Sequence, residues 1–133
     1  PPDYEGGNAM PHARRHLAAF ASMGVDLMLG GHLHRAYIGN SLDVLPSHPQ
    51  ETPVVIVQSG TTSSSRGRAR ERMSCSFNEI RFDEVTIEVT HHHLDRGAGE
   101  FRPTGLHLFP RHPRRALPSD APDRALEVLR RVE

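Results

Sequence analysis

The spacing of apolar residues between positions 9 and 23 predicts the first element of the chain, an amphipathic helix. Apolar side chains recur there every three or four residues, and the arginines lie off the stripe. The stripe consists of Ala13, Leu17, Phe20 and Ala21. Asn8 can cap the start of this helix, and Gly24 suits the left-handed position that follows its end.

Two later runs, residues 25–29 and 54–58, are apolar without alternation. Such runs are typical of strands that are buried on both faces. We therefore expect both to be interior strands of one sheet, adjacent to each other and covered by the helix 9–23. A helix followed closely by a buried strand indicates an α/β fold.

Period-two alternation appears only further along the chain. Residues 76–82 and 85–90 alternate between apolar and polar side chains, and Asp83-Glu84 separates them. This pattern predicts a hairpin with one packed face and one open face.

The remaining segments carry turn and linker signals. Residues 59–75 are polar and rich in arginine, which predicts a loop. Prolines and arginines dominate after Arg102, so we expect a linker over 102–121 and a peripheral helix over 122–132.

Composition narrows the classes of partner and compartment. The 133 residues carry a net charge of zero with histidine neutral, which argues against nucleic acid or an anionic membrane as a partner. No run approaches the roughly 20 apolar residues of a membrane span. Cys75 is the single cysteine, which fits a reducing, cytoplasmic compartment. Whether a leader sequence precedes Pro1 is left open.

The candidate chemistry lies in the run Leu29-Gly30-Gly31-His32-Leu33-His34, directly after the first predicted strand. The glycines allow a tight turn. In extended backbone, side chains two residues apart point the same way, so His32 and His34 could each hold one ion of a close metal pair. The alternative is two loop histidines that face water.

Two other groups of histidines are weaker candidates. His12 and His16 lie four residues apart on one predicted helix face, but no carboxylate or cysteine stands nearby, which favours a surface or rim role. The run His91-His92-His93 continues a strand, so alternate side chains point to opposite faces and cannot all converge on one ion. We expect a solvated strand end that binds metal only adventitiously.

Two arginines are candidates for substrate binding. Arg35 follows the histidine pair and could reach a substrate phosphate, although a solvated or salt-bridged arginine fits as well. Arg66 could border the same cleft. The run 66–72 lacks interleaved aromatic residues, which favours a solvated loop over a nucleic-acid site.

These motifs together resemble the calcineurin-like metallophosphoesterases. Residues 24–34 resemble the last metal-binding motif of that family, Gly-His-x-His after a buried strand. Residues 1–7 resemble the segment that follows its His-His-Pro-Pro-type motif. Residues 58–66 and 76–80 resemble the C-terminal strands of its cyclic-nucleotide-phosphodiesterase-like bacterial branch. The similarity runs in family order from residue 1 to about Phe101.

The resemblance implies a fold and a function. Residues 1–101 would be the C-terminal portion of a four-layer αββα sandwich, with a mixed sheet and a flanking helix, and residues 102–133 would be linker and peripheral helix. His32 and His34 would bind two different divalent ions (manganese, iron or zinc). The reaction would be hydrolysis of a small-molecule phosphomonoester or phosphodiester by a metal-activated hydroxide.

The family's earlier motifs, Asp-x-His, Gly-Asp and Gly-Asn-His-Asp/Glu, would lie before Pro1. We therefore expect this chain to be the C-terminal part of a longer enzyme and to be inactive alone. Two alternatives stay open. One is a non-catalytic fragment or interaction module. The other is a cupin-type metal protein, which needs a glutamate soon after the histidines, whereas the first acidic residue after His34 is Asp43.

Overall fold

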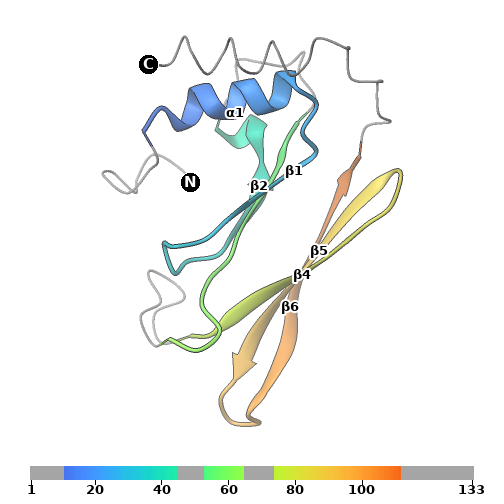
Figure 1. The fold of residues 1–133 in the computed structure, drawn as a ribbon. Coiled ribbons are helices and arrows are strands. Elements are labelled where there is room, and N and C mark those ends of the chain that lie inside the picture. The colour runs from blue at the N-terminus through green and yellow to red at the C-terminus, as the bar shows by residue number, and fades with distance from the viewer. Residues whose placement is uncertain (1–10, 45–52, 65–73, 112–133) are drawn as a thin grey trace. The chain divides into compact units, whose positions relative to one another are not determined.

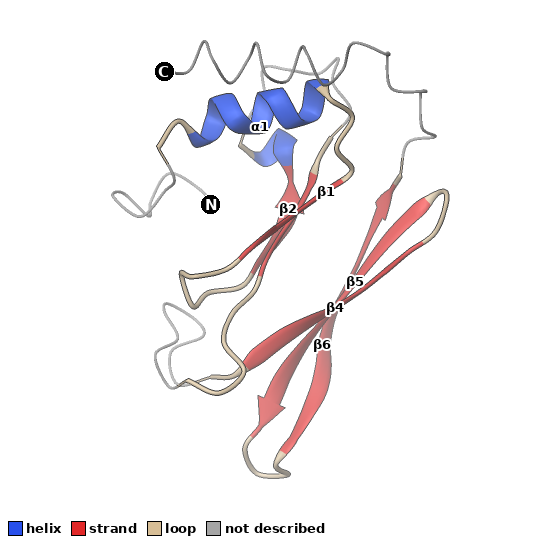
Figure 2. Ribbon diagram, viewed as in Figure 1, coloured by secondary structure: helices blue, strands red, loops and turns tan. Residues whose placement is uncertain are grey.

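The computed structural model describes residues 11–44, 53–64 and 74–111. These residues form an α/β structure with one α-helix and two three-stranded sheets (Figures 1 and 2). Two compact units can be distinguished, one with residues 11–28, 39–44 and 53–55 and the other with residues 29–38, 56–64 and 74–111. Within these ranges, no helix combines the length and apolarity that a bilayer crossing requires.

The helix α1 spans Ala13–Ser22 and is shorter than the predicted 9–23. It begins after His12, whose φ of 56° is left-handed, and the predicted cap Asn8 lies outside the described residues. The predicted role of Gly24 is confirmed, because its φ is 73°. Its N–H donates to Ala21 and the Val25 N–H donates to Phe20, both at 3.0 Å, which closes the helix end.

The first sheet has the strand order β1-β3-β2, with β1 at Leu27–Gly30, β2 at Tyr37–Asn40 and β3 at Val55–Gln58. The Val55 N–H donates to the backbone carbonyl of Asp26, and the Ser59 N–H donates to the backbone carbonyl of Gly30, each at 2.9 Å. Both donors follow their acceptors by the same number of residues, so β1 and β3 run parallel.

The strand β2 joins the other side of β3. The Ser41 N–H, just after β2, donates to Val54, just before β3, at 2.8 Å. The end of one strand therefore lies beside the start of the other, so this pair is antiparallel and the sheet is mixed. A 3₁₀ turn, η1 at Ser41–Asp43, follows β2.

The prediction that both apolar strands are adjacent is confirmed, but the prediction that both are interior is wrong for the described residues. β3 is central and all four of its residues are buried. β1 is at the edge, and Leu29 is 64% exposed. Apolar composition alone does not reveal how many neighbours a strand has.

The second sheet has the order β4-β5-β6, with β4 at Ser76–Phe82, β5 at Thr86–Asp95 and β6 at Glu100–Pro110. All pairing is antiparallel, so the predicted hairpin is confirmed. Its turn is held by Asp83, whose carboxylate accepts the N–H groups of Val85 and Thr86 at 2.8 Å. On one face Ile87 and Val89 are buried, and Glu88 between them is half-buried.

The strand β6 corrects the prediction that residues 102–121 form a linker. Prolines at positions 103 and 110 gave this segment the composition of a linker. β6 lies at the sheet edge, where a residue without an N–H is tolerated, and Pro103 lies beside a β-bulge at His91/His92. The remaining linker and the helix predicted over 122–132 lie outside the described residues, apart from Arg111.

Candidate functional site

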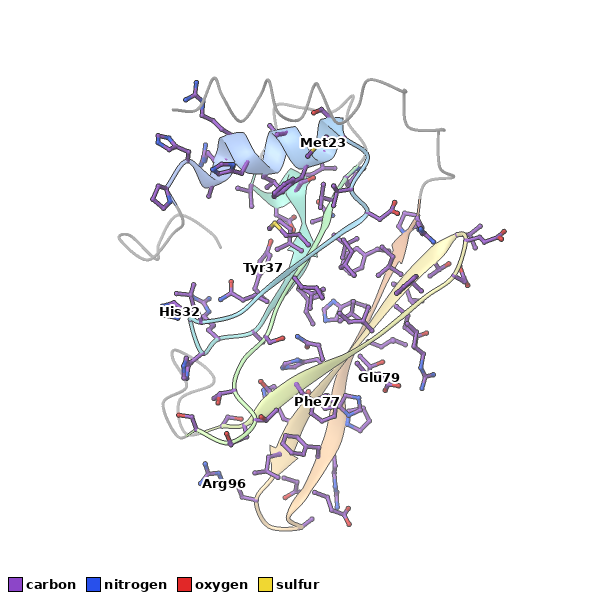
Figure 3. The ribbon with its side chains drawn as sticks, in the orientation of Figure 1. Met23, His32, Tyr37, Phe77, Glu79 and Arg96 are labelled. Carbon is purple, nitrogen blue, oxygen red and sulfur yellow. The ribbon has the colours of Figure 1, made fainter. Side chains whose placement is uncertain are left out.

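The loop after β1 carries the predicted histidine pair, and Figure 3 shows His32 at its tip. Both histidines have left-handed backbone, with φ of 72° at His32 and 52° at His34. The Leu33 N–H donates to the Gly31 carbonyl at 2.9 Å, so the chain makes a three-residue turn centred on His32. The prediction of extended backbone at this pair is wrong, because two residues with positive φ reverse the chain where the glycines were expected to do so.

This conformation is costly for residues that carry a Cβ. A left-handed backbone costs a residue other than glycine about 1–2 kcal/mol. Such strain persists only where the surrounding structure holds it, and it concentrates at functional sites. The loop is held by the buried Leu33 side chain and by the Ser59 N–H, which donates to the Gly30 carbonyl at 2.9 Å.

The two histidines differ in burial. His32 is exposed, whereas His34 is half-buried. The Nδ1 atom of His34 is inaccessible to water and has no hydrogen-bond partner within the described residues. Leaving a buried polar nitrogen without a partner costs about 1–3 kcal/mol. An imidazole nitrogen in this state fits a metal ligand, because coordination would replace the missing hydrogen bond.

The described residues do not by themselves form a complete metal site at this loop. Within 11–44, 53–64 and 74–111, no group of three His, Cys, Asp or Glu side chains lies close enough to hold an ion. Any further ligands would have to come from elsewhere. Arg35, the candidate for substrate phosphate, is half-buried beside the pair, and Arg66 lies outside the described residues.

The other predicted histidine pair does not share a helix face. His12 precedes α1 with left-handed backbone and accepts the N–H groups of Arg15 at 2.9 Å and His16 at 3.1 Å through its carbonyl. Only His16 lies within the helix. Because the backbone of His12 is left-handed, its side chain does not have the direction that it would have inside the helix. The i, i+4 geometry predicted for chelation by His12 and His16 is therefore absent.

The run His91-His92-His93 lies inside β5 and not at a solvated strand end, which corrects that prediction. The expected alternation of faces is confirmed. The rings of His91 and His93 lie 4.4 Å apart at 90°, while His92 stacks on Phe77 at 4.6 Å and 4° on the other face. β5 is longer than predicted, and the partner strand β6 makes the run part of the sheet interior.

The pKa of His91 is lowered to about 4. Burial is the main cause, since it penalises the charged ring, and the positive charges of His93, His107 and His92 act in the same direction. His92 faces Glu79, with its Nε2 3.5 Å from the carboxylate, and Figure 3 shows Phe77 and Glu79 on β4. Arg81, bonded at 2.7 Å, is the first cause that lowers the pKa of Glu79, and His92 is a lesser one.

Sequence reasoning missed Asn78. Its Oδ1 lies 2.6 Å from Nδ1 of His91, and its Nδ2 donates to the Gln58 carbonyl at 3.4 Å. The only signal in the sequence was the hairpin itself, whose register places Asn78 opposite His91.

Comparison with known proteins gives no family for this chain. No family model, no curated protein and no solved structure matches it. The candidate site therefore rests on its own residues.

Proposed function

We propose that this chain supplies two histidine ligands, His32 and His34, to the dinuclear metal centre of a phosphoesterase. The observation that carries the proposal is the loop after β1. Both histidines there hold a strained left-handed backbone, and the buried Nδ1 of His34 has no hydrogen-bond partner among the described residues. The likeness of residues 24–34 to the Gly-His-x-His motif supports the same assignment.

His32 and His34 would each donate one imidazole lone pair, and the strained turn at His32 would fix the direction of both rings before an ion binds. Divalent manganese, iron or zinc suits imidazole, and when bound it lowers the pKa of a water so that hydroxide forms near neutral pH. The Arg35 guanidinium, next to the pair, would orient an anionic phosphoryl oxygen.

The finer parts of the proposal depend on the family likeness. We infer a four-layer αββα sandwich for the whole enzyme, of which β1, β3 and α1 would be part. The substrate class would be a small phosphomonoester or phosphodiester. The proposal requires Asp-x-His, Gly-Asp and Gly-Asn-His-Asp/Glu motifs, in that order, in a segment before Pro1. The coding sequence upstream of Pro1 tests this directly, and their absence would leave an interaction module.

A binding experiment tests the ligands themselves. We expect purified chain to bind Mn²⁺ or Zn²⁺ more weakly after His34→Asn, because asparagine keeps the polar volume and removes the imidazole nitrogen. His16→Asn is the matched control, since His16 lies on α1 away from the loop in sequence. Equal affinity in the His34 variant and its parent would refute the assignment, when calorimetry is done on chains that also carry His91→Gln and His93→Gln to remove the histidine pair of β5.

A further inference from the structure

His91 and His93 occupy one face of β5, the face that also carries the buried Val89. Their rings lie 4.4 Å apart and at right angles. Two imidazoles that share one ion, with metal–nitrogen bonds of about 2.0–2.1 Å, bring their ring centres to within about 5 Å. The observed separation of the two ring centres, 4.4 Å, lies within this limit.

Asn78 sets the tautomer of His91. The amide nitrogen of Asn78 donates to the Gln58 carbonyl, so its oxygen is the atom that faces the ring at 2.6 Å. An amide oxygen can only accept, so Nδ1 of His91 carries the proton and Nε2 carries the lone pair of the neutral ring. Metal-binding histidines commonly have this arrangement, with the second nitrogen bonded to an oxygen.

Thr104 sets the tautomer of His93. The Thr104 hydroxyl donates to the His91 carbonyl at 3.3 Å, so its oxygen is left to accept from Nδ1 of His93 at 2.8 Å. Thr104 is the extra residue of the bulge in β6, between Pro103, which pairs with His92, and Gly105, which pairs with His91. The bulge thus positions a hydroxyl under the second imidazole.

We propose that the Nε2 atoms of His91 and His93 form a second site, separate in its ligands from His32 and His34, for a late divalent transition metal ion such as Cu²⁺, Ni²⁺ or Zn²⁺. Asn78 and Thr104 are its positioning residues. Within the described ranges no three ligand side chains converge, so the described part of the site provides two protein ligands, and the remaining coordination positions are left to water or to further ligands. Imidazole and water ligands give the affinity order Cu²⁺ above Ni²⁺ and Zn²⁺, with Mg²⁺ excluded.

Imidazole-nitrogen NMR tests the site without any activity assay. In metal-free protein carrying His32→Asn and His34→Asn, two-bond ¹H–¹⁵N spectra should show the Nδ1–H tautomer for His91 and His93. Titration with Zn²⁺ should shift the Nε2 resonances of these two residues together. His92 lies on the opposite face and should not shift with them.

Variants then measure how much each ligand contributes to Zn²⁺ binding. His91→Gln and His93→Gln should each weaken Zn²⁺ binding at this site at least tenfold, and Thr104→Val should weaken it about 10–100-fold by releasing His93. His92→Gln is the matched control and should change affinity less than about twofold. Circular dichroism reports whether each variant folds.

Two outcomes would overturn the proposal. One is the Nε2–H tautomer at His91 or His93 in the unmodified protein, a readout that needs no variant to fold. The other is equal loss of Zn²⁺ binding in the His92 and His93 variants, or no loss in either, which would mean adventitious binding at surface histidines.

Discussion

Asn78 holds His91 across the β4–β5 pair, with its Oδ1 2.6 Å from the ring Nδ1. The two residues are direct partners in the antiparallel register. Because Asn78 also donates to the Gln58 carbonyl, one side chain connects the end of β3 to the middle of β5. Burial of the His91 ring, together with the charges of His93, His107 and His92, lowers its pKa, and this shift underlies the first prediction.

The stability of the protein should fall as pH is lowered from about 6.5 to about 4. The pKa of His91 is lowered in the folded state to about 4, from its ordinary value of 6.5. The unfolded chain therefore binds more protons in this window, and protonation favours unfolding. Above pH 6.5 His91 is neutral in both states, so none of this stability is lost there. Urea unfolding at pH 7.5 and pH 5 measures it.

The control for that prediction is His91→Gln, which removes the titrating ring from among His93, His107 and His92. The difference in unfolding free energy between pH 7.5 and pH 5 should shrink in this variant. A difference as large as in the unmodified chain would place the titration elsewhere.

Replacing His32 by glycine should stabilise the metal-free protein or leave it unchanged. Glycine adopts a φ of 72° without the penalty of about 1–2 kcal/mol that a Cβ brings, which offsets its greater flexibility when unfolded. His93→Gly, in the regular strand β5, should instead lower stability by about 1 kcal/mol or more. Thermal unfolding compares the two. A larger loss at His32 than at His93 would show that the turn is not strained.

In the complete phosphoesterase that we propose, His34→Ala should lower turnover by orders of magnitude and reduce the metal content. His92→Ala should change neither, because His92 stacks on Phe77 within the second sheet and is not one of the proposed ligands. Turnover of a chromogenic phosphodiester and elemental analysis provide the two measurements. Equal losses from both substitutions would mean that the site is misplaced.

The 133-residue chain by itself should not hydrolyse a phosphodiester above background with Mn²⁺. The loop after β1 offers two imidazoles, and a pair of ions with an activated hydroxide requires more ligands than that. Robust turnover that disappears in His34→Ala would show that the remaining ligands lie within this chain.

The buried centre of the first sheet should be far more sensitive than the hairpin turn. Val57→Ala in β3 removes two methyl groups at a residue that is 1% exposed, and should cost about 2–3 kcal/mol. Val85→Ala makes the same change at a residue that is 65% exposed, and should cost less than about 0.5 kcal/mol. Denaturant midpoints give both values.

Local patterns in the sequence determined a substantial part of this protein. The apolar stripe and Gly24 located the body and the end of α1, since capping and periodicity involve only neighbours along the chain. Alternation located the β4–β5 hairpin, and the apolar run at 54–58 located the buried strand β3. The opposite faces of the run His91–His93 also followed, because side-chain direction in a strand repeats every second residue.

Only the tertiary structure decided the rest. β6 has the composition of a linker and becomes a strand because the edge of β5 offers it hydrogen bonds. The apolar composition of β1 predicts an interior strand, but β1 lies at an edge of the described sheet. The left-handed backbone of His32 and His34 is imposed by contacts around the loop, against the local preference of histidine. Likewise, the partners that orient His91 and His93 come from other strands, and sequence spacing carries no record of that pairing.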